Sequence, residues 1–359
     1  MSTNMAIVVE KPGLAVKAEV PRPKLRDEYI LVRVQAVALN PTDWKHVDFL
    51  TSKGALIGCD YAGIVEEIGS AVTKRFQVGD TICGFVHGGN EVQHEDGAFA
   101  NYILAKGDLQ IRIPSTLKVE EASTLGVGIT TVGQALYQSL GLPLPVLSDM
   151  AFQSGEGETT KQTILIYGGS TATGALAIQF AKLSGLRVVT TSSPKNFDYL
   201  KSLGATAVFD YNLSSCSSDI RTAYPDIYLA LDCISAGKSS TITVGAMSRV
   251  TPGYYTSLLP VSKDALKTIN NTVQIKSTMA YTALGEHFTI GPKIFEANSE
   301  DLEFGRRFWE LAAALLESKQ IQIHKPGINK YGDGFEGILN GLQAMREGKV
   351  SAEKLVVTL

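Results

Sequence analysis

The sequence predicts an α/β protein with two domains, one rich in β-strands and one built on a doubly wound parallel sheet. Three observations predict this class. The first third of the chain consists of short β-branched runs separated by glycine and aspartate turns. In the middle of the chain, apolar strands alternate with helical segments roughly every twenty residues. The 359 residues are also long enough for about two domains of roughly 150 residues each.

The composition is that of an ordinary globular protein and excludes several classes. Hydrophobic residues make up 44% of the chain and charged residues 19%, which argues against a disordered, collagen-like or coiled-coil protein. The net charge is −3 and no basic cluster stands out along the sequence, so neither a nucleic acid nor a membrane is an expected partner. The four cysteines are far apart and no apolar stretch reaches about 18 residues, so we expect a cytoplasmic protein with reduced thiols.

The N-terminal third predicts a barrel-like or sandwich-like β unit. Its apolar runs are rich in β-branched residues and are bounded by turns such as Val78-Gly79-Asp80. The expected strands span residues 29–39, 61–68, 81–86 and 99–105. From residue 120 to 140 the pattern changes to a long helical segment rich in threonine and alanine, which indicates a domain transition.

The centre of the chain predicts βαβ units. It is preceded by the polar segment 143–162, which is long for a loop inside a compact domain and is either a functional insertion or a mobile connection. Strands that alternate with helices form a parallel sheet covered on both faces. The expected strands span residues 163–167, 186–191, 207–211 and 228–234, and the expected helices span 173–184 and 196–203.

The C-terminal tail predicts two amphipathic helices, residues 301–318 and 335–347, and a final apolar strand, residues 354–359. A doubly wound sheet does not need this tail, so we expect it to return to the first domain. The expected division is therefore residues 1–124 plus 296–359 for the β-rich domain and residues 125–295 for the parallel-sheet domain.

A phosphate-binding loop is the main functional signal in the sequence. Small residues between an apolar strand and a helix let the backbone approach a diphosphate, and the helix N-terminus supplies free N–H groups and partial positive charge. The alternative is an ordinary tight turn between a strand and a helix. The surrounding pattern of strand, turn, helix and strand favours a dinucleotide site. The candidate residues are Gly168, Gly169, Ser170, Thr171, Ala172, Thr173 and Gly174.

The end of the second central strand indicates which dinucleotide would bind. An enzyme that uses NAD places an acidic residue there, on the ribose 2′-hydroxyl. This chain instead has Ser193, Lys195 and Asn196 after that strand. A hydroxyl and an ammonium can bond and neutralise a 2′-phosphate. We therefore predict NADPH as the cofactor, with a merely solvated Lys195 as the alternative.

Several motifs together resemble the medium-chain dehydrogenase/reductase superfamily. They are Leu39-Asn40-Pro41-Thr42-Asp43, Gly58-Cys59-Asp60-Tyr61-Ala62-Gly63, Val78-Gly79-Asp80, the loop Gly168–Gly174 and Lys354-Leu355-Val356-Val357. The resemblance implies a GroES-like β-rich catalytic domain and a Rossmann domain. Within the superfamily the chain is most similar to fungal trans-acting enoyl reductases of polyketide biosynthesis, of the lovastatin-pathway type. The segments that carry this similarity are 167–173, 193–198, 209–211 and 230–234.

The resemblance also implies that the chain holds no catalytic zinc. Zinc-dependent members have a cysteine ligand at the position of Asn40 and a histidine ligand at the position of Cys59. Cys59 alone cannot supply the three protein ligands of a catalytic zinc site. The zinc-free branch of the superfamily reduces activated C=C bonds. We expect surface or packing roles for the five histidines, His46, His87, His94, His287 and His324.

The resemblance assigns roles to further residues. Lys45 matches a lysine that faces the nicotinamide, so it would position the substrate or deliver a proton; the alternative is a solvated helix lysine. Thr131 matches a threonine near the nicotinamide, and the alternative is a helix threonine that bonds its own backbone. Tyr211 would lie against the adenosine end of the cofactor. For Asp60, capping or an ion pair is the preferred role.

The resulting hypothesis is an NADPH-dependent enoyl reductase that acts in trans on an unsaturated polyketide thioester, bound to the acyl carrier protein of a partner synthase. One rival is a stand-alone quinone or alkenal reductase of the same fold. A second rival is a non-catalytic nucleotide-binding partner of a synthase. The reductases that the chain resembles include monomers, so a monomer is favoured over a dimer.

Overall fold

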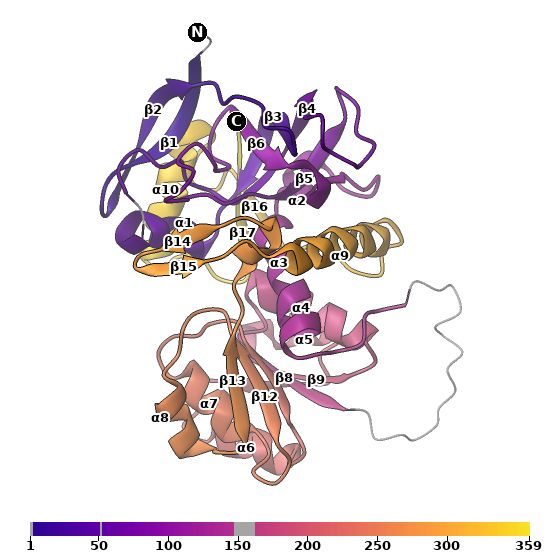
Figure 1. The fold of residues 1–359 in the computed structure, drawn as a ribbon. Helices are drawn as coiled ribbons and strands as arrows, with labels where there is room; N and C mark the ends of the chain where they lie inside the picture. The colour runs from indigo at the N-terminus through magenta and orange to yellow at the C-terminus, as the bar shows by residue number, and fades with distance from the viewer. Residues whose placement is uncertain (1–2, 51, 147–161) are drawn as a thin grey trace. The chain divides into compact units, whose positions relative to one another are not determined.

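The computed structural model describes residues 3–50, 52–146 and 162–359, and the chain forms two compact units (Figure 1). The first unit comprises Met1–Thr130 and Tyr281–Leu359, and the second comprises Thr131–Ala280. The first unit thus resumes earlier than the expected boundary at residue 296. The reason is packing, because the ring of Tyr281 stacks on His87 with 3.8 Å between centroids and Phe288 lies edge-on to His87.

The first unit is built on a mixed, mainly antiparallel sheet of seven strands. The order is β16-β17-β3-β4-β5-β7, and β6 also pairs with β3. The last strand of the chain, β17, lies antiparallel to β3, which confirms the predicted return of the tail. The strands are β3 (Tyr29–Ala38), β4 (Asp60–Ile68), β5 (Thr81–Phe85), β6 (Tyr102–Lys106), β7 (Ile111–Arg112), β16 (Pro326–Ile328) and β17 (Lys354–Thr358).

Two hairpins of the first unit have no counterpart in the sequence prediction. The strands β1 (Thr3–Lys11) and β2 (Leu14–Pro21) pair through a turn at Gly13, whose φ of 81° favours glycine. Ile7 and Val9 of β1 are buried in the core of the unit. The second hairpin joins β14 (Phe288–Ile290) and β15 (Lys293–Phe295).

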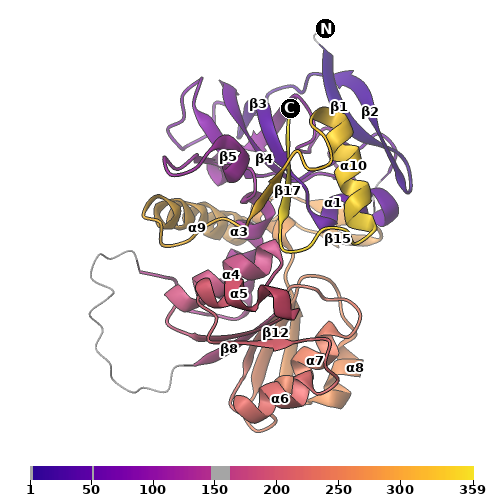
Figure 2. The same cartoon turned by 180° about the vertical axis from the view of Figure 1, so that it is seen from behind.

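Helices cover parts of the first unit. Helix α9 (Ser299–Glu317) begins at Asn298, whose side-chain oxygen accepts bonds from the backbone N–H groups of Glu300 and Asp301. Helix α10 (Gly334–Arg346) runs beside β1 and β2 (Figure 2) and buries Ile338 and Leu342 in the same core. The shorter helices are α1 (Pro41–Lys45), η1 (His46–Leu50), η2 (Gly107–Leu109), α2 (Val119–Ala122) and η6 (Ala280–Leu284).

The predicted long helix over residues 120–140 is wrong, because the segment is broken into three pieces. Helix α2 ends at Ala122, and α3 (Gly126–Gly133) is followed by the π-helical turn η3 (Gln134–Ser139). The side chain of Asp60 causes the new start: its Oδ1 accepts a bond of 2.6 Å from the backbone N–H of Val127. A Cβ at Gly126 would lie 2.3 Å from that same oxygen, so only glycine fits there.

The second unit is the predicted doubly wound parallel sheet. Its strand order is β10-β9-β8-β11-β12-β13, and all neighbours are parallel. Figure 1 shows α4 and α5 on one face of this sheet and α6, α7 and α8 on the other. The strands are β8 (Thr163–Tyr167), β9 (Arg187–Ser192), β10 (Ala207–Asp210), β11 (Leu229–Asp232), β12 (Gly253–Ser257) and β13 (Val273–Ser277). The helices are α4 (Ala172–Leu183), η5 (Pro194–Asn196), α5 (Phe197–Ser202), α6 (Cys216–Ala223), α7 (Ser239–Ala246) and α8 (Lys263–Ile269).

Most of the polar segment 143–162 lies outside the described residues, so its predicted character stays a prediction. Over the part of the chain that the structure describes, no helix has both the length and the apolar character needed to cross a membrane.

Candidate active site

The loop between β8 and α4 passes tightly over the carboxyl end of the sheet in the second unit. Gly168 has a φ of 82°, a conformation that glycine adopts without strain. A Cβ at Gly169 would lie 2.2 Å from Oγ1 of Thr190 on β9, and a Cβ at Gly174 would lie 2.3 Å from the carbonyl oxygen of Gly168. These glycines are therefore required for close packing of strand, loop and helix, as in dinucleotide-binding turns.

The hydroxyl of Thr171 shapes the start of α4. Its Oγ1 accepts a bond of 3.0 Å from the backbone N–H of Gly174 and donates one of 2.8 Å to the carbonyl oxygen of Gly168. Thr171 thus caps the helix N-terminus, while Ser170, Ala172 and Thr173 are half-buried. Helix α4 has 12 residues, and its first turn supplies backbone donors and partial positive charge beside side chains of small volume.

The end of β9 carries hydroxyls and no carboxylate. The side-chain amide of Asn196 donates to Oγ of Ser192 at 3.2 Å and to Oγ of Ser193 at 3.3 Å, which fixes this corner. Lys195 is exposed in the 3₁₀ turn that follows. The next acidic residue along the chain, Asp198, is exposed in the first turn of α5.

Tyrosine and aspartate side chains lie at the carboxyl ends of the strands β8, β10 and β11. Tyr211, directly after β10, is 40% exposed, and its ring centroid lies 6.2 Å from that of Tyr167 at the end of β8. Asp232, at the end of β11, is fully buried. It accepts bonds from the hydroxyls of Ser239 (2.7 Å) and Tyr255 (3.0 Å) and from two backbone N–H groups. Asp232 therefore holds the loop after β11 in place.

Helix α1 in the first unit carries Lys45 and Asp43. Lys45 is half-buried, burial lowers its pKa, and it forms an ion pair with none of the described residues. Its Nζ lies 5.7 Å from the centroid of the Trp44 ring. Asp43 is buried and its Oδ2 accepts the backbone N–H of Asn40 at 2.7 Å. Burial raises the pKa of Asp43 to about 7.

A buried cluster beside α1 was missed by the sequence reasoning. The hydroxyl of Tyr281 lies 3.0 Å from Oγ1 of Thr42 and 3.6 Å from Sγ of Cys59. Nδ1 of His46 lies 2.8 Å from the carbonyl oxygen of Thr42. Burial, and secondarily His46, lowers the pKa of His87 far below its usual value, so this ring is neutral. Tyr281 stacks on His87 although the two residues are more than 190 positions apart in the chain, and no local sequence motif predicts this contact.

The residues at the expected zinc-ligand positions do not fit a zinc ion. The ammonium of Lys354 lies 2.8 Å from Oδ2 of Asp60 and donates a hydrogen bond to Oδ1 of Asn40. Burial raises the pKa of the Cys59 thiol well above its usual value, whereas zinc binds the thiolate. An ammonium and a protonated thiol thus stand where ligands would be needed. The predicted ion-pair role of Asp60 is confirmed.

The expected packing or surface roles of the histidines agree with their burial. His46, His87 and His324 are buried, whereas His94 and His287 are exposed. Among the described residues, no group of three histidine, cysteine or acidic side chains is arranged to hold a metal ion.

Thr131 lies in α3 and is buried. Its hydroxyl forms a hydrogen bond with none of the described residues. The neighbouring Thr130, in contrast, donates to the carbonyl oxygen of Gly126 at 3.1 Å and accepts from the indole N–H of Trp309 at 3.1 Å. The two adjacent threonines therefore differ: Thr130 is a structural helix threonine, and Thr131 keeps its hydroxyl uncommitted.

Family models match both units. The alcohol dehydrogenase GroES-like domain matches residues 26–115, and the zinc-binding dehydrogenase model matches residues 172–249. The solved structure of a putative zinc-dependent alcohol dehydrogenase from Rhizobium etli aligns over 100% of this chain and 99% of its own, with a TM-score of 0.80 and 22% identity. The JamJ enoyl reductase aligns over 99% of both chains with a TM-score of 0.75 and 17% identity, a likeness of fold alone. The fold and these matches define a medium-chain dehydrogenase/reductase, a class of nicotinamide-dependent oxidoreductases.

Closer relatives specify the family. Trans-enoyl reductase ACTTS2 from Alternaria alternata is 44% identical over 99% of both chains. Trans-enoyl reductase resD from Aspergillus sclerotiorum is 45% identical over 98% of this chain and 99% of its own. Trans-enoyl reductase TOXD from Cochliobolus carbonum is 48% identical over 86% of this chain and 99% of its own. The chain belongs to the family of trans-enoyl reductases.

Proposed function

We propose that the protein uses NADPH to reduce the α,β C=C bond of an enoyl thioester that a partner polyketide synthase carries. The observation that supports this most is the pairing of a small-residue loop before α4 with a β9 end that lacks a carboxylate. A carboxylate at that corner would repel a 2′-phosphate, whereas hydroxyls and an ammonium attract it.

In this proposal the second unit holds the dinucleotide. The backbone of Gly168, Gly169, Ala172 and neighbouring residues borders the diphosphate, and the N-terminal turn of α4 faces its negative charge. The hydroxyls of Ser170 and Thr173 are further donors there, whereas the Thr171 hydroxyl is committed to the cap.

The adenosine end of the dinucleotide is proposed to contact three residues of the β9 corner and the residue that follows β10. Ser193, Lys195 and Asn196 would bind the 2′-phosphate, and Tyr211 would stack on the adenosine. Exposure of Lys195 and partial exposure of Tyr211 leave both side chains accessible to a ligand. NADPH supplies a hydride, and these residues select and orient it.

Lys45 and Thr131 are the proposed catalytic residues. Reduction of an enoyl thioester places negative charge on the carbonyl oxygen and requires a proton at the α-carbon. Burial lowers the pKa of Lys45, which makes its ammonium a better proton donor near neutral pH. The Thr131 hydroxyl has no competing partner among the described residues and is available as a hydrogen-bond donor.

The partner and the compartment complete the proposal. The relatives are named trans-enoyl reductases, which supports a reductase separate from the chain that carries its substrate. All four cysteines are free, which fits a reducing compartment such as the cytoplasm. We propose a monomer as the working form, with a dimer as the alternative.

The test measures binding and turnover separately. NADPH and NADH are titrated against the purified protein, and NADPH oxidation is followed with an enoyl pantetheine thioester and with the same acyl group on a carrier protein. We expect tighter binding of NADPH and turnover of both thioesters. Equal affinity for the two dinucleotides would contradict the cofactor assignment, and preferential turnover of simple quinones would contradict the substrate assignment.

A further inference from the structure

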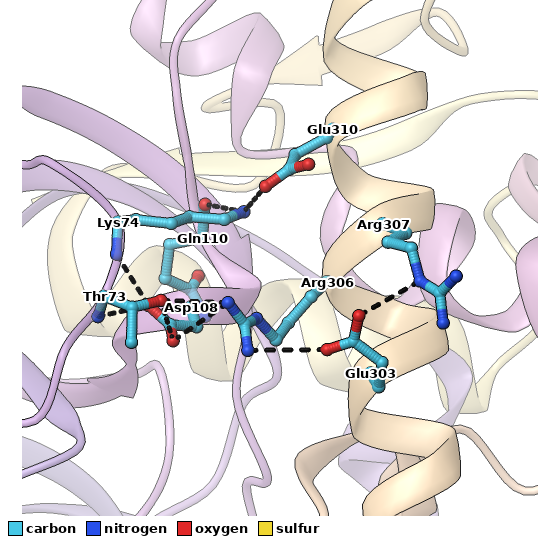
Figure 3. A network of polar contacts seen from close by, with 8 residues as sticks. All are labelled: Thr73, Lys74, Asp108, Gln110, Glu303, Arg306, Arg307 and Glu310. Carbon is cyan, nitrogen blue, oxygen red and sulfur yellow. Dashed lines mark hydrogen bonds and ion pairs between the residues drawn. The ribbon is translucent and has the colours of Figure 1, made fainter.

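The charged groups beside helix α9 in the first unit are bonded largely to one another. A groove of about 540 Å³ lies there, and Arg75 and Arg306 are among its lining residues. Figure 3 shows that Arg306 pairs with Asp108, at 3.6 Å. In the same view Lys74 pairs with Glu310, at 3.8 Å. Because these charges neutralise one another, they stabilise the unit and do not call for a charged partner.

An apolar surface lies elsewhere in the first unit, next to Lys45. The ring centroids of Trp44 and Phe49 are 6.3 Å apart in an edge-on arrangement, a spacing at which aromatic rings attract each other. Nζ of Lys45 lies 5.7 Å from the centroid of the Trp44 ring. The two rings therefore form one apolar surface that begins beside this ammonium.

The two rings differ in how far they are covered by the protein. Trp44 is half-buried and packs against the core of the first unit. Phe49 is 73% exposed. A single exposed apolar side chain is common, but an exposed ring that adjoins a second ring gives a larger apolar area in contact with water. Covering this area with an apolar ligand is favourable.

The backbone of η1 brings the two rings together. Residues five apart point to different sides of an α-helix, which has about 3.6 residues per turn. The π-helical turn His46–Leu50 is wider, since its hydrogen bonds join residues five apart, and Phe49 lies beside Trp44 as a result. Turns of this kind are rare and occur often at functional sites.

Contacts with two other elements hold the π-helical turn in place. The carboxylate of Asp48 accepts bonds of 3.1 Å from Nε and 2.8 Å from Nη2 of Arg346, at the end of α10. The carbonyl oxygen of Val47 accepts the backbone N–H of Gly13 at 3.0 Å. The exposed ring of Phe49 thus sits on a fixed support, which reduces the entropy lost when a ligand binds to it.

We propose that the rings of Trp44 and Phe49 bind the alkyl chain of the acyl group, so that the enzyme prefers long-chain enoyl thioesters. The inference rests on the proposed function, which places the reacting carbons beside Lys45. A chain that continues from there along the two rings removes apolar surface of both partners from water. The pantetheine arm is a poorer occupant, because its amides would lose water and the phenyl ring offers them no hydrogen-bonding group.

The binding test uses saturated acyl pantetheine thioesters, which resemble the product and are not turned over. Butanoyl, hexanoyl and octanoyl thioesters are titrated against the protein while acrylamide quenches tryptophan fluorescence. The chain has two tryptophans and Trp309 is fully buried, so quenching reports on Trp44. Phe49→Ser removes the exposed ring. Val78→Ser is the matched control, because Val78 is 68% exposed and belongs to the same unit.

Full burial of a CH₂ group strengthens binding about fourfold. Since the chain lies on an open surface, we expect a gain of about twofold per CH₂ in the wild type and in Val78→Ser, with growing protection of Trp44. The gain should nearly vanish in Phe49→Ser and partly return in Phe49→Leu. The same gain per CH₂ in Phe49→Ser and the wild type would overturn the proposal. Equal weakening of all three thioesters in Phe49→Ser would place the pantetheine arm on the rings and overturn it as well.

Turnover gives a second measurement. With NADPH, kcat/KM for the octenoyl thioester should exceed that for the butenoyl thioester about tenfold in the wild type and less than about threefold in Phe49→Ser. Val78→Ser should keep the wild-type ratio. A wild-type dimer that Phe49→Ser converts to a monomer in ultracentrifugation would show that a second copy covers the rings, and would overturn the proposal. Failure of the wild type to reduce any thioester would refute the proposed function, whereas the binding series would still decide whether the rings hold an alkyl chain.

Discussion

The buried polar cluster of the first unit and the loop region of the second unit differ in how their polar groups are bonded. In the first unit, Asp60 and Lys354 are buried together, and Tyr281 and Thr42 bond to each other. In the second unit, the loop before α4 carries only small residues, and β9 ends on hydroxyls followed by the exposed Lys195. The buried groups of the first unit bond to one another and stabilise the fold, whereas the loop and the exposed Lys195 of the second unit are the groups that we propose bind an anionic ligand. Substitutions can test whether stability and ligand affinity separate in this way.

The largest expected effect is on the buried ion pair of the first unit. Lys354→Met keeps most of the side-chain volume but leaves the Asp60 carboxylate buried without its partner, which should cost about 3–5 kcal/mol of the free energy of unfolding. Urea denaturation measures this loss. The exposed pair of Lys330 and Glu353 provides the control, and Lys330→Met should change stability little. Adding Asp60→Asn to Lys354→Met should recover part of this loss. If the double variant is no more stable than Lys354→Met alone, the unpaired carboxylate is not the cause of the loss.

A smaller loss of stability is expected from a glycine-to-alanine substitution at the loop of the second unit, where such a substitution in a helix would usually stabilise the protein. Alanine normally stabilises a helix by about 1 kcal/mol relative to glycine. At Gly174, however, the added Cβ would lie 2.3 Å from a backbone oxygen and 2.9 Å from Cα of Gly169. We therefore expect Gly174→Ala to lose about 1–3 kcal/mol and to weaken NADPH binding. Calorimetric unfolding and NADPH titration check both effects, and a stabilised variant would contradict the observed packing.

Charge at the end of β9 should change affinity without changing stability. Lys195→Glu places a carboxylate where the 2′-phosphate is proposed to bind. The preference for NADPH over NADH should fall by about 10- to 100-fold, which corresponds to about 1.4–2.7 kcal/mol. Lys201→Glu, on an exposed position of α5, is the control. Unchanged preference in Lys195→Glu would remove this residue from the site.

A pH dependence of stability is also expected in the first unit. Burial raises the pKa of Asp43 from 3.8 to about 7, so the folded state binds a proton more tightly than the unfolded state. Stability from this group is fully present below pH 3.8 and declines as the pH rises through about 7. Asp43→Asn should flatten this decline by on the order of 2 kcal/mol, read from urea midpoints at pH 5 and pH 7.5. Parallel pH profiles of the two proteins would show that Asp43 does not titrate in this range.

Substitutions of the proposed catalytic residues, Lys45 and Thr131, should change activity and leave cofactor affinity unchanged. Lys45→Met and Thr131→Val preserve shape and should lower kcat for the enoyl thioester by about 100-fold or more, with NADPH affinity retained. Full activity of both variants would show that neither residue is catalytic and would favour the alternative that the protein is a non-catalytic, nucleotide-binding partner of a synthase. The stability of Thr131→Val should be near that of the wild type, because the hydroxyl bonds to none of the described residues.

Local sequence patterns were sufficient to predict most of the strands and helices of the second unit. Strand and helix periodicity located β8, α4, β9, α5, β10 and β11 to within a few residues. The small residues of 168–174 marked the loop, since only a glycine-rich turn allows strand and helix to pack so closely. The later strands β12 and β13 were not predicted. Tyr254 and Gln274, both exposed, interrupt their apolar character.

The structure of the first unit was harder to predict, because it depends more on contacts between residues that are far apart in the sequence. No strand was predicted over residues 5–9, yet this apolar run is the centre of β1, because pairing with β2 satisfies its backbone. The segment 120–140 read as one helix, but the Asp60 carboxylate, far away in sequence, caps a new start at Val127. No local pattern carries such information.

By itself, the sequence determined the fold class, the order of the central strands and helices as far as β11, and the small-residue loop before α4, because each of these follows from residue types at short spacing. Only the tertiary structure decided that Tyr281 packs on His87, that Lys354 neutralises Asp60, and that Arg75 shares a groove with Arg306. The physical reason is that burial, ion pairing and local charge density are properties of groups brought together in space.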